Sequence, residues 1–140
     1  MKRIRAAALL LSGLVCMSVF SACSDFAFNP IGKWEFTTMI DTDGEEYDVY
    51  EDIFSSKYHV YLVFEKSGTA YFMYDDEVAS ERITYTYEYD DESVTITAYD
   101  TYTDDVTVFS DYVVSDDGQT LTYTEESDEG YEIVRTYERV

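Results

Sequence analysis

The sequence predicts an all-β protein, an eight-stranded antiparallel barrel with up-and-down connections. Apolar and polar residues alternate with a period of two through most of the chain, which is typical of strands that bury one face. Gly, Ser and acidic residues interrupt this alternation about every 8 to 12 residues, as expected of turns between short strands. All 15 Tyr lie beyond residue 40, and aromatic and β-branched residues favour strands over disorder.

The alternation divides the chain into eight strands joined by short turns. Lys66-Ser67-Gly68 predicts a tight hairpin turn with Gly68 at positive φ. The other turns are too short for crossover helices, so neighbouring strands must pair antiparallel. Closing such a meander removes its exposed edges, whereas a Greek-key sandwich would need longer loops, and the barrel is therefore favoured. The predicted strands cover residues 33–40, 58–65, 69–74, 82–89, 93–99, 106–114, 120–124 and 131–140.

The segment between the first two strands does not follow the strand pattern. Tyr47, Tyr50 and Phe54 recur at i, i+3 and i+7, the spacing of one face of a helix. We expect residues 45–56 to form a short helix or a lid, and a further edge strand is the alternative.

The first 22 residues have the composition of a secretory signal peptide. Lys2, Arg3 and Arg5 give a basic start, and an apolar stretch of about 15 residues follows. A membrane-spanning helix needs roughly 20 residues, so this stretch is short for a span. We therefore expect residues 1–22 to be removed.

Phe20-Ser21-Ala22-Cys23 resembles the lipobox of bacterial lipoproteins, in which small residues precede a cysteine that is acylated, for example with palmitate. Phe20 departs from that pattern, which usually has Leu, Val or Ile. The resemblance implies lipid attachment at Cys23, a tether at residues 23–31, a domain at residues 32–140, and a location on the non-cytoplasmic side of a bacterial membrane in the cell envelope. Ordinary secretory cleavage that leaves Cys23 as a free thiol is the alternative.

The mature chain is strongly acidic. Loss of residues 1–22 removes three basic side chains and no acidic ones, leaving 6 Lys and Arg against 30 Asp and Glu, a net charge near −24. This charge argues against nucleic acid as a partner, because phosphates need a basic surface. It also argues against the domain lying flat on anionic lipid. A basic envelope protein would suit it.

Gly32-Lys33-Trp34 opens the first strand and resembles the G-x-W signature of lipocalins and of the small lipocalin-like domains of bacterial lipoproteins. The resemblance implies a barrel of this topology with an arginine of the last strand packed across Trp34. Arg135 and Arg139 are the candidates. Barrel closure sets the end of the last strand beside the beginning of the first, so Trp34 and Arg139 are predicted to form the barrel-closing pair.

The residues of common catalytic and metal sites are mostly missing. His59 is the lone histidine, and a zinc site needs more His and Cys than the chain holds. The acidic turn at residues 41–46 lacks the distal bidentate Glu of an EF-hand. Paired carboxylates could serve glycoside hydrolysis, but the acids cluster in solvated turns. We therefore predict no enzyme, no cofactor and no metal.

The remaining signal is an aromatic inner face. Its rings either fill the barrel or line a cavity with apolar walls and polar tips. We predict a membrane-anchored module that binds a small hydrophobic or amphipathic ligand, and an envelope protein–protein interaction domain with a filled barrel and acidic loops is the alternative. The cavity candidates are Phe36, Phe64, Phe72, Tyr85, Tyr87 and Tyr112.

Overall fold

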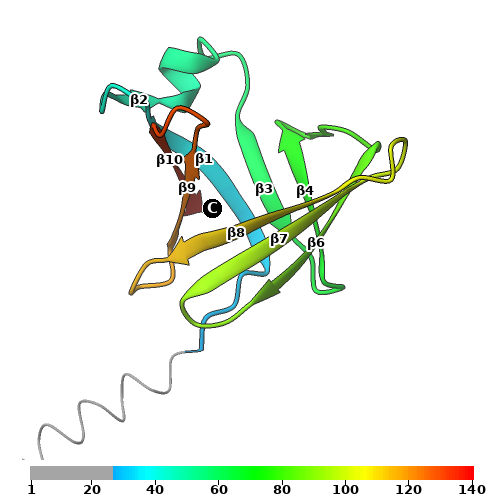
Figure 1. The fold of residues 1–140 in the computed structure, drawn as a ribbon. Coiled ribbons are helices and arrows are strands. Elements are labelled where there is room, and N and C mark those ends of the chain that lie inside the picture. The colour runs from blue at the N-terminus through cyan, green and yellow to red at the C-terminus, as the bar shows by residue number, and fades with distance from the viewer. Residues whose placement is uncertain (1–26) are drawn as a thin grey trace, which may run out of the picture.

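The structure, a computed structural model, describes residues 27–140, in which one antiparallel sheet closes on itself into a barrel (Figure 1). The predicted signal peptide at residues 1–22 and the lipid attachment site at Cys23 lie outside the described residues.

Eight strands form the barrel wall. Each pairs antiparallel with the next along the chain, and the last strand returns to pair with the first. The predicted up-and-down barrel is thus confirmed, with every predicted strand end within two residues of the observed one. The wall strands are β1 (Gly32–Ile40), β3 (Val60–Phe64), β4 (Thr69–Tyr74), β6 (Ile83–Tyr89), β7 (Ser93–Asp100), β8 (Val106–Val114), β9 (Thr120–Glu126) and β10 (Glu132–Arg139).

Two short strands and one helical turn flank the strands of the barrel wall. β2 (Glu46–Asp48) pairs with the end of β1, and η1 (Val49–Ile53), a single π-helical turn, follows it directly. The carboxylate of Asp48 caps η1 by accepting the N–H of Glu51 at 2.8 Å. The segment predicted as helix, lid or edge strand is therefore an edge strand followed by a short helix. β5 (Glu77–Val78) pairs with β4.

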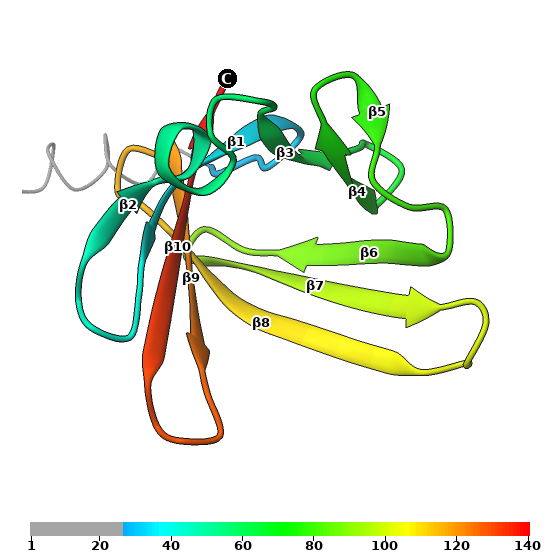
Figure 2. The ribbon, with the colours of Figure 1, turned by 90° about the horizontal axis from the view of Figure 1, so that it is seen from above.

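The wall strands stay together at one end of the barrel and separate at the other (Figure 2). Among the described residues, β4 and β6 pair only through Thr69–Thr86 and Ala70–Tyr85. β8 and β9 pair only through Val113–Thr122 and Val114–Leu121. We call the end where β1 begins and β10 ends the closed end. The opposite end, where residues 101–105 join β7 to β8, is the open end, and there β6, β7 and β8 form a three-stranded sheet that stands apart from its neighbours.

The Gly32-Lys33-Trp34 motif builds the closed end. Gly32 has φ +130, a conformation that side-chain-bearing residues rarely adopt. Trp34 is fully buried, and its indole N–H donates to the carbonyl of Pro30 at 2.9 Å. Arg139 pairs with Trp34 in the strand register, and its guanidinium carbon lies 4.3 Å from the indole ring centre. The choice of Arg139 over Arg135 as the residue covering Trp34 is thus confirmed.

The described part of the predicted tether is packed into the closed end. Phe28 and Pro30 are buried, and the Phe28 ring lies 6.2 Å from that of Trp34. Asp91 accepts the backbone N–H of Phe28 at 3.1 Å. Phe28 and Pro30 of the predicted tether are therefore packed into the domain, whereas Ile31 is exposed. Arg139 donates to the carbonyls of Asn29 and Ile31.

Candidate ligand-binding site

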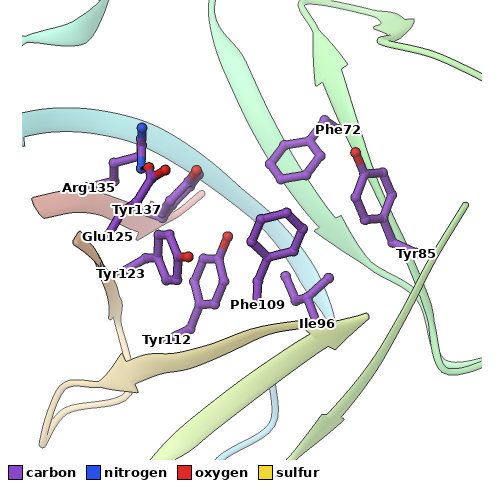
Figure 3. Close-up of a pocket in the computed structure, with 9 residues that line it drawn as sticks. All are labelled: Phe72, Tyr85, Ile96, Phe109, Tyr112, Tyr123, Glu125, Arg135 and Tyr137. Atoms are coloured by element: carbon purple, nitrogen blue, oxygen red, sulfur yellow. Dashed lines mark hydrogen bonds and ion pairs between the residues drawn. The ribbon is translucent and has the colours of Figure 1, made fainter. Parts of the chain in front are cut away.

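A pocket of about 220 Å³ lies inside the barrel, between the three-stranded β6–β8 sheet and strands β9 and β10 (Figure 3). It is present because, among the described residues, β8 pairs with β9 only at Val113 and Val114, and the part of β8 before Val113 stands away from β9. Apolar and phenolic rings dominate its wall, with one acid and one base at its rim. The lining residues are Phe72, Tyr85, Ile96, Phe109, Tyr112, Tyr123, Glu125, Arg135 and Tyr137.

Three of the six predicted cavity residues line this pocket, namely Phe72, Tyr85 and Tyr112. Phe72 and Tyr85 meet edge to face, with ring centres 5.2 Å apart. These two residues come from β4 and β6, the strands that separate on the other side of the β6–β8 sheet.

The other three predicted residues point inward but do not line the pocket. Phe64 is buried in the core and packs edge to face against Tyr87. The Tyr87 hydroxyl donates to the carbonyl of Glu65 at 2.6 Å. Phe36 stacks on Tyr137, with ring centres 5.1 Å apart. These three rings contact neighbouring aromatic rings of the core and are not part of the lining of this pocket.

A β-bulge in β8 explains why the alternation of the sequence did not predict Phe109 as a cavity residue. Tyr112 pairs with Val94 and Phe109 with Ile96, so two residues of β8 stand opposite one residue of β7. Such a bulge reverses the alternation of faces along the strand. Phe109 and Tyr112 therefore both reach the interior although three positions separate them.

Burial controls the protonation of the pocket phenols. The side chains of Tyr112 and Tyr137 are each 4% exposed. Loss of hydration raises the pKa of Tyr137 to about 12 and raises the pKa of Tyr112 further. The pKa of Tyr85 is also raised, first by burial and then by Tyr74. Tyrosines are already neutral at physiological pH, and burial extends the neutral state of these rings to alkaline pH.

Arg135 forms an ion pair with Glu125 at the edge of the pocket. Its side chain is 27% exposed and that of Glu125 is 50% exposed. An ion pair so open to water contributes little to stability. It does place a positive charge close to Tyr112 and Tyr137, whose pKa values it lowers against the larger effect of burial.

A second pocket of about 240 Å³ adjoins the first toward the open end and shares Tyr85 and Phe109 with it. Asp100 and Asp105 contribute carboxylates to its wall. Arg82 donates to both oxygens of Asp100, and this contact, with backbone N–H groups, lowers the pKa of Asp100 to about 2. Asp100 is therefore an anion held by a neighbouring cation rather than a proton donor.

Comparison with protein-family models, with curated proteins and with solved structures finds no match to this chain. Among the side chains that the structure describes, those of residues 27–109 and 112–140, no group of three or more His, Cys, Asp or Glu is arranged to hold a metal ion. In the same residues no helix has the length and apolar character needed to cross a membrane.

His59 lies outside both pockets. Its ring stacks on Tyr50 of η1, with ring centres 4.0 Å apart, and its Nδ1 contacts the carboxylate of Glu35. These contacts hold η1 against the outer side of β1. His59 thus has a packing role in this structure.

Proposed function

We propose that this protein is a membrane-anchored binding module for a small hydrophobic or amphipathic ligand. The observation that carries the proposal is the pocket of about 220 Å³, whose wall combines apolar rings with phenol hydroxyls. Such walls suit ligands that have an apolar body and a polar end.

The volume limits the size of the ligand. An apolar cavity of about 150 Å³ is large enough to hold benzene. Pockets for drug-sized molecules have volumes of about 300 to 1,000 Å³. The pocket near 220 Å³ therefore suits a molecule with a single ring or a short branched chain.

The anchor would set the direction in which the pocket faces. Phe28 lies only five positions after Cys23, and a chain of that length reaches at most about 18 Å. Because Phe28 is packed at the closed end, lipid attached to Cys23 would hold that end toward the membrane. The open end, with the acidic turn at residues 101–105, would face the aqueous phase. Ligand would then arrive from solution rather than from the bilayer.

Ligand binding is tested by titrating the Cys23→Ser chain with toluene and following the aromatic and methyl NMR signals. We expect saturable shifts at residues around Tyr85 and Phe109. Tyr85→Ala should weaken binding, because it removes a ring shared by both pockets. Tyr89→Ala is the matched control, since Tyr89 is a β6 tyrosine at the closed end. Absence of any saturable shift in the parent chain would overturn the proposed function.

The anchor is tested by the same Cys23→Ser substitution in the native host. We expect loss of acyl labelling and release of the protein from membranes, because two or more acyl chains hold a protein stably to a bilayer. A Cys16→Ser chain is the control, since residue 16 lies within the predicted signal peptide. Unchanged membrane association of the Cys23→Ser chain would contradict the anchor.

A second candidate function is docking of a basic envelope protein, and the outer side of β8 favours it. Val106 and Val108 are 61% and 59% exposed. Among the described residues, this half of β8 has no partner strand on the β9 side. An extended basic segment could add to that edge through backbone hydrogen bonds. Val108→Lys should abolish such an interaction without changing toluene binding, and an unchanged pull-down would exclude it.

A further inference from the structure

Two tyrosines in the wall of the pocket can offer hydroxyl groups to a ligand. Tyr112 of β8 and Tyr137 of β10 are each 4% exposed, and their ring centres lie 6.0 Å apart. Figure 3 shows both rings reaching from their strands into the space between them. Among the side chains that the structure describes, Arg139 Nε is the one buried nitrogen or oxygen without a hydrogen-bond partner, so neither hydroxyl is sealed in the core without one. A ligand acceptor that receives a hydrogen bond from such a hydroxyl gains a modest net affinity.

Both hydroxyls are available as donors. Burial raises their pKa values well above neutrality, so the O–H groups keep their protons in the folded protein. A neutral phenol donates one hydrogen bond. The stacked contacts with Phe36 and Tyr123 fix the two rings, because Phe36 lies against Tyr137 and Tyr123 against Tyr112.

Arg135 adds further donors beside the phenols. A guanidinium has five N–H groups, and Glu125 accepts from Nη1. The positive charge of Arg135 lowers the pKa values of both Tyr112 and Tyr137, so the guanidinium lies close to both phenols. We call Tyr112, Tyr137 and Arg135 the polar corner. This corner offers more donors than acceptors.

The opposite part of the wall is apolar. Phe72, Ile96 and Phe109 line it and provide no polar side-chain atoms. A ligand in the pocket would therefore direct its apolar body toward these residues and its polar end toward the polar corner.

We propose that the pocket selects small uncharged molecules that carry an acceptor oxygen, a ketone or ester carbonyl, which receives hydrogen bonds from Tyr112 and Tyr137. This inference rests on the proposed ligand-binding function and specifies its chemistry. The ring of such a ligand packs against Phe72 and Phe109, while its carbonyl oxygen lies in the polar corner.

The charge balance favours an uncharged ligand over an ion. Glu125 already neutralises Arg135, so a carboxylate would have to displace it from the ion pair. The mature chain also carries a net charge near −24, which repels anions. A cationic end fits the polar corner poorly, because it would lie beside Arg135 and bring donors to a site that needs an acceptor.

The experiment compares four ligands of similar size on the Cys23→Ser chain by NMR titration: acetophenone, ethylbenzene, benzoate and benzylamine. Acetophenone and ethylbenzene differ by a carbonyl in place of a methylene. We expect acetophenone to bind about threefold to tenfold more tightly, the effect of one net hydrogen bond. Tyr137→Phe and Tyr112→Phe should each reduce that ratio toward one while leaving ethylbenzene binding unchanged. Tyr89→Phe, at the closed end, should leave the ratio unaltered.

Ethylbenzene binding in the variants reports that the pocket is intact. Equal binding of acetophenone and ethylbenzene to the parent chain would overturn the acceptor preference and leave the proposed function in place. Tighter binding of benzoate or benzylamine than of acetophenone would overturn the choice of an uncharged ligand. If the preference for acetophenone is unchanged in both Tyr137→Phe and Tyr112→Phe, the two tyrosine hydroxyls do not cause it. Failure of all four ligands to bind would overturn the proposed function as well.

Discussion

The closed and open ends of the barrel use the same kinds of side chain for different purposes. At the closed end, Phe28, Trp34 and Tyr89 pack together around a fully buried indole. Toward the open end, Tyr85 and Phe109 border empty space. The difference follows from strand pairing, because β4 leaves β6 and β8 leaves β9 after two paired positions each. Aromatic residues become core where strands remain paired and cavity wall where they separate.

The two inward arginines of β10 show the same contrast. Arg139 lies over Trp34, donates to the backbone carbonyls of Asn29 and Ile31, and has its pKa lowered by burial. Arg135 contacts the carboxylate of Glu125, which is half exposed. Fixed backbone acceptors make Arg139 part of the architecture. Arg135, whose partner is an exposed carboxylate, lines the pocket instead.

The largest expected effect is a difference in lost stability between core substitutions at the closed end and at the open end. Trp34→Ala should lower the free energy of unfolding by about 3 to 5 kcal/mol, because it removes a large, fully buried side chain. Phe109→Ala should cost about 1 to 2 kcal/mol, since Phe109 already borders a cavity. Urea unfolding followed by circular dichroism gives both values. Equal losses would mean that the two ends are packed equally well.

Backbone strain at the closed end gives the next effect. Gly32→Ala should cost about 1 to 3 kcal/mol, because φ +130 is unfavourable for any residue with a Cβ. Gly130→Asn, in the open-end turn at φ +82, should change stability by less than about 1 kcal/mol, since Asn tolerates the left-handed region. The same urea titrations measure both variants. If Gly32→Ala leaves the free energy of unfolding unchanged, stability does not depend on this backbone conformation.

The contact between Trp34 and Arg139 should appear as a coupling energy of about 0.5 to 2 kcal/mol. In a double-mutant cycle, Arg139→Ala should cost less when Trp34 is already replaced by Phe. Arg135→Ala is the control at the open end, and its effect should simply add to that of Trp34→Phe. If the effects of Arg139→Ala and Trp34→Phe simply add, the cation–π contact does not contribute to barrel closure.

The smallest expected effect is a change in stability at alkaline pH that depends on the phenol of Tyr137. Its pKa in the folded state is about 12, above the value near 10 expected when unfolded. Between these two pH values the folded state binds the proton that the unfolded state has lost, so stability falls as pH rises from about 10 to about 12. Tyr137→Phe should move alkaline unfolding to higher pH, as followed by circular dichroism. Tyr89→Phe, the closed-end control, should move it less.

The sequence predicted the wall of the barrel better than its interior. Period-two alternation located all eight strands, because each strand buries one face against the core and exposes the other. The G-x-W start and the antiparallel closure together predicted the contact between Trp34 and Arg139. For the candidate site, alternation identified Phe72, Tyr85 and Tyr112, and it also included Phe36, Phe64 and Tyr87, which pack elsewhere.

By itself, then, the sequence determined the class of fold, the order of strands and the pair that closes the barrel, since local alternation and chain order suffice for these. Only the tertiary structure decided where β8 leaves β9, and hence where the pocket lies. It also placed Phe109 inside through a bulge, and packed Phe28 into the closed end. These features depend on pairings between residues far apart in the chain. Alternation along a strand shows which residues share a face, but not how far the facing strand stands away.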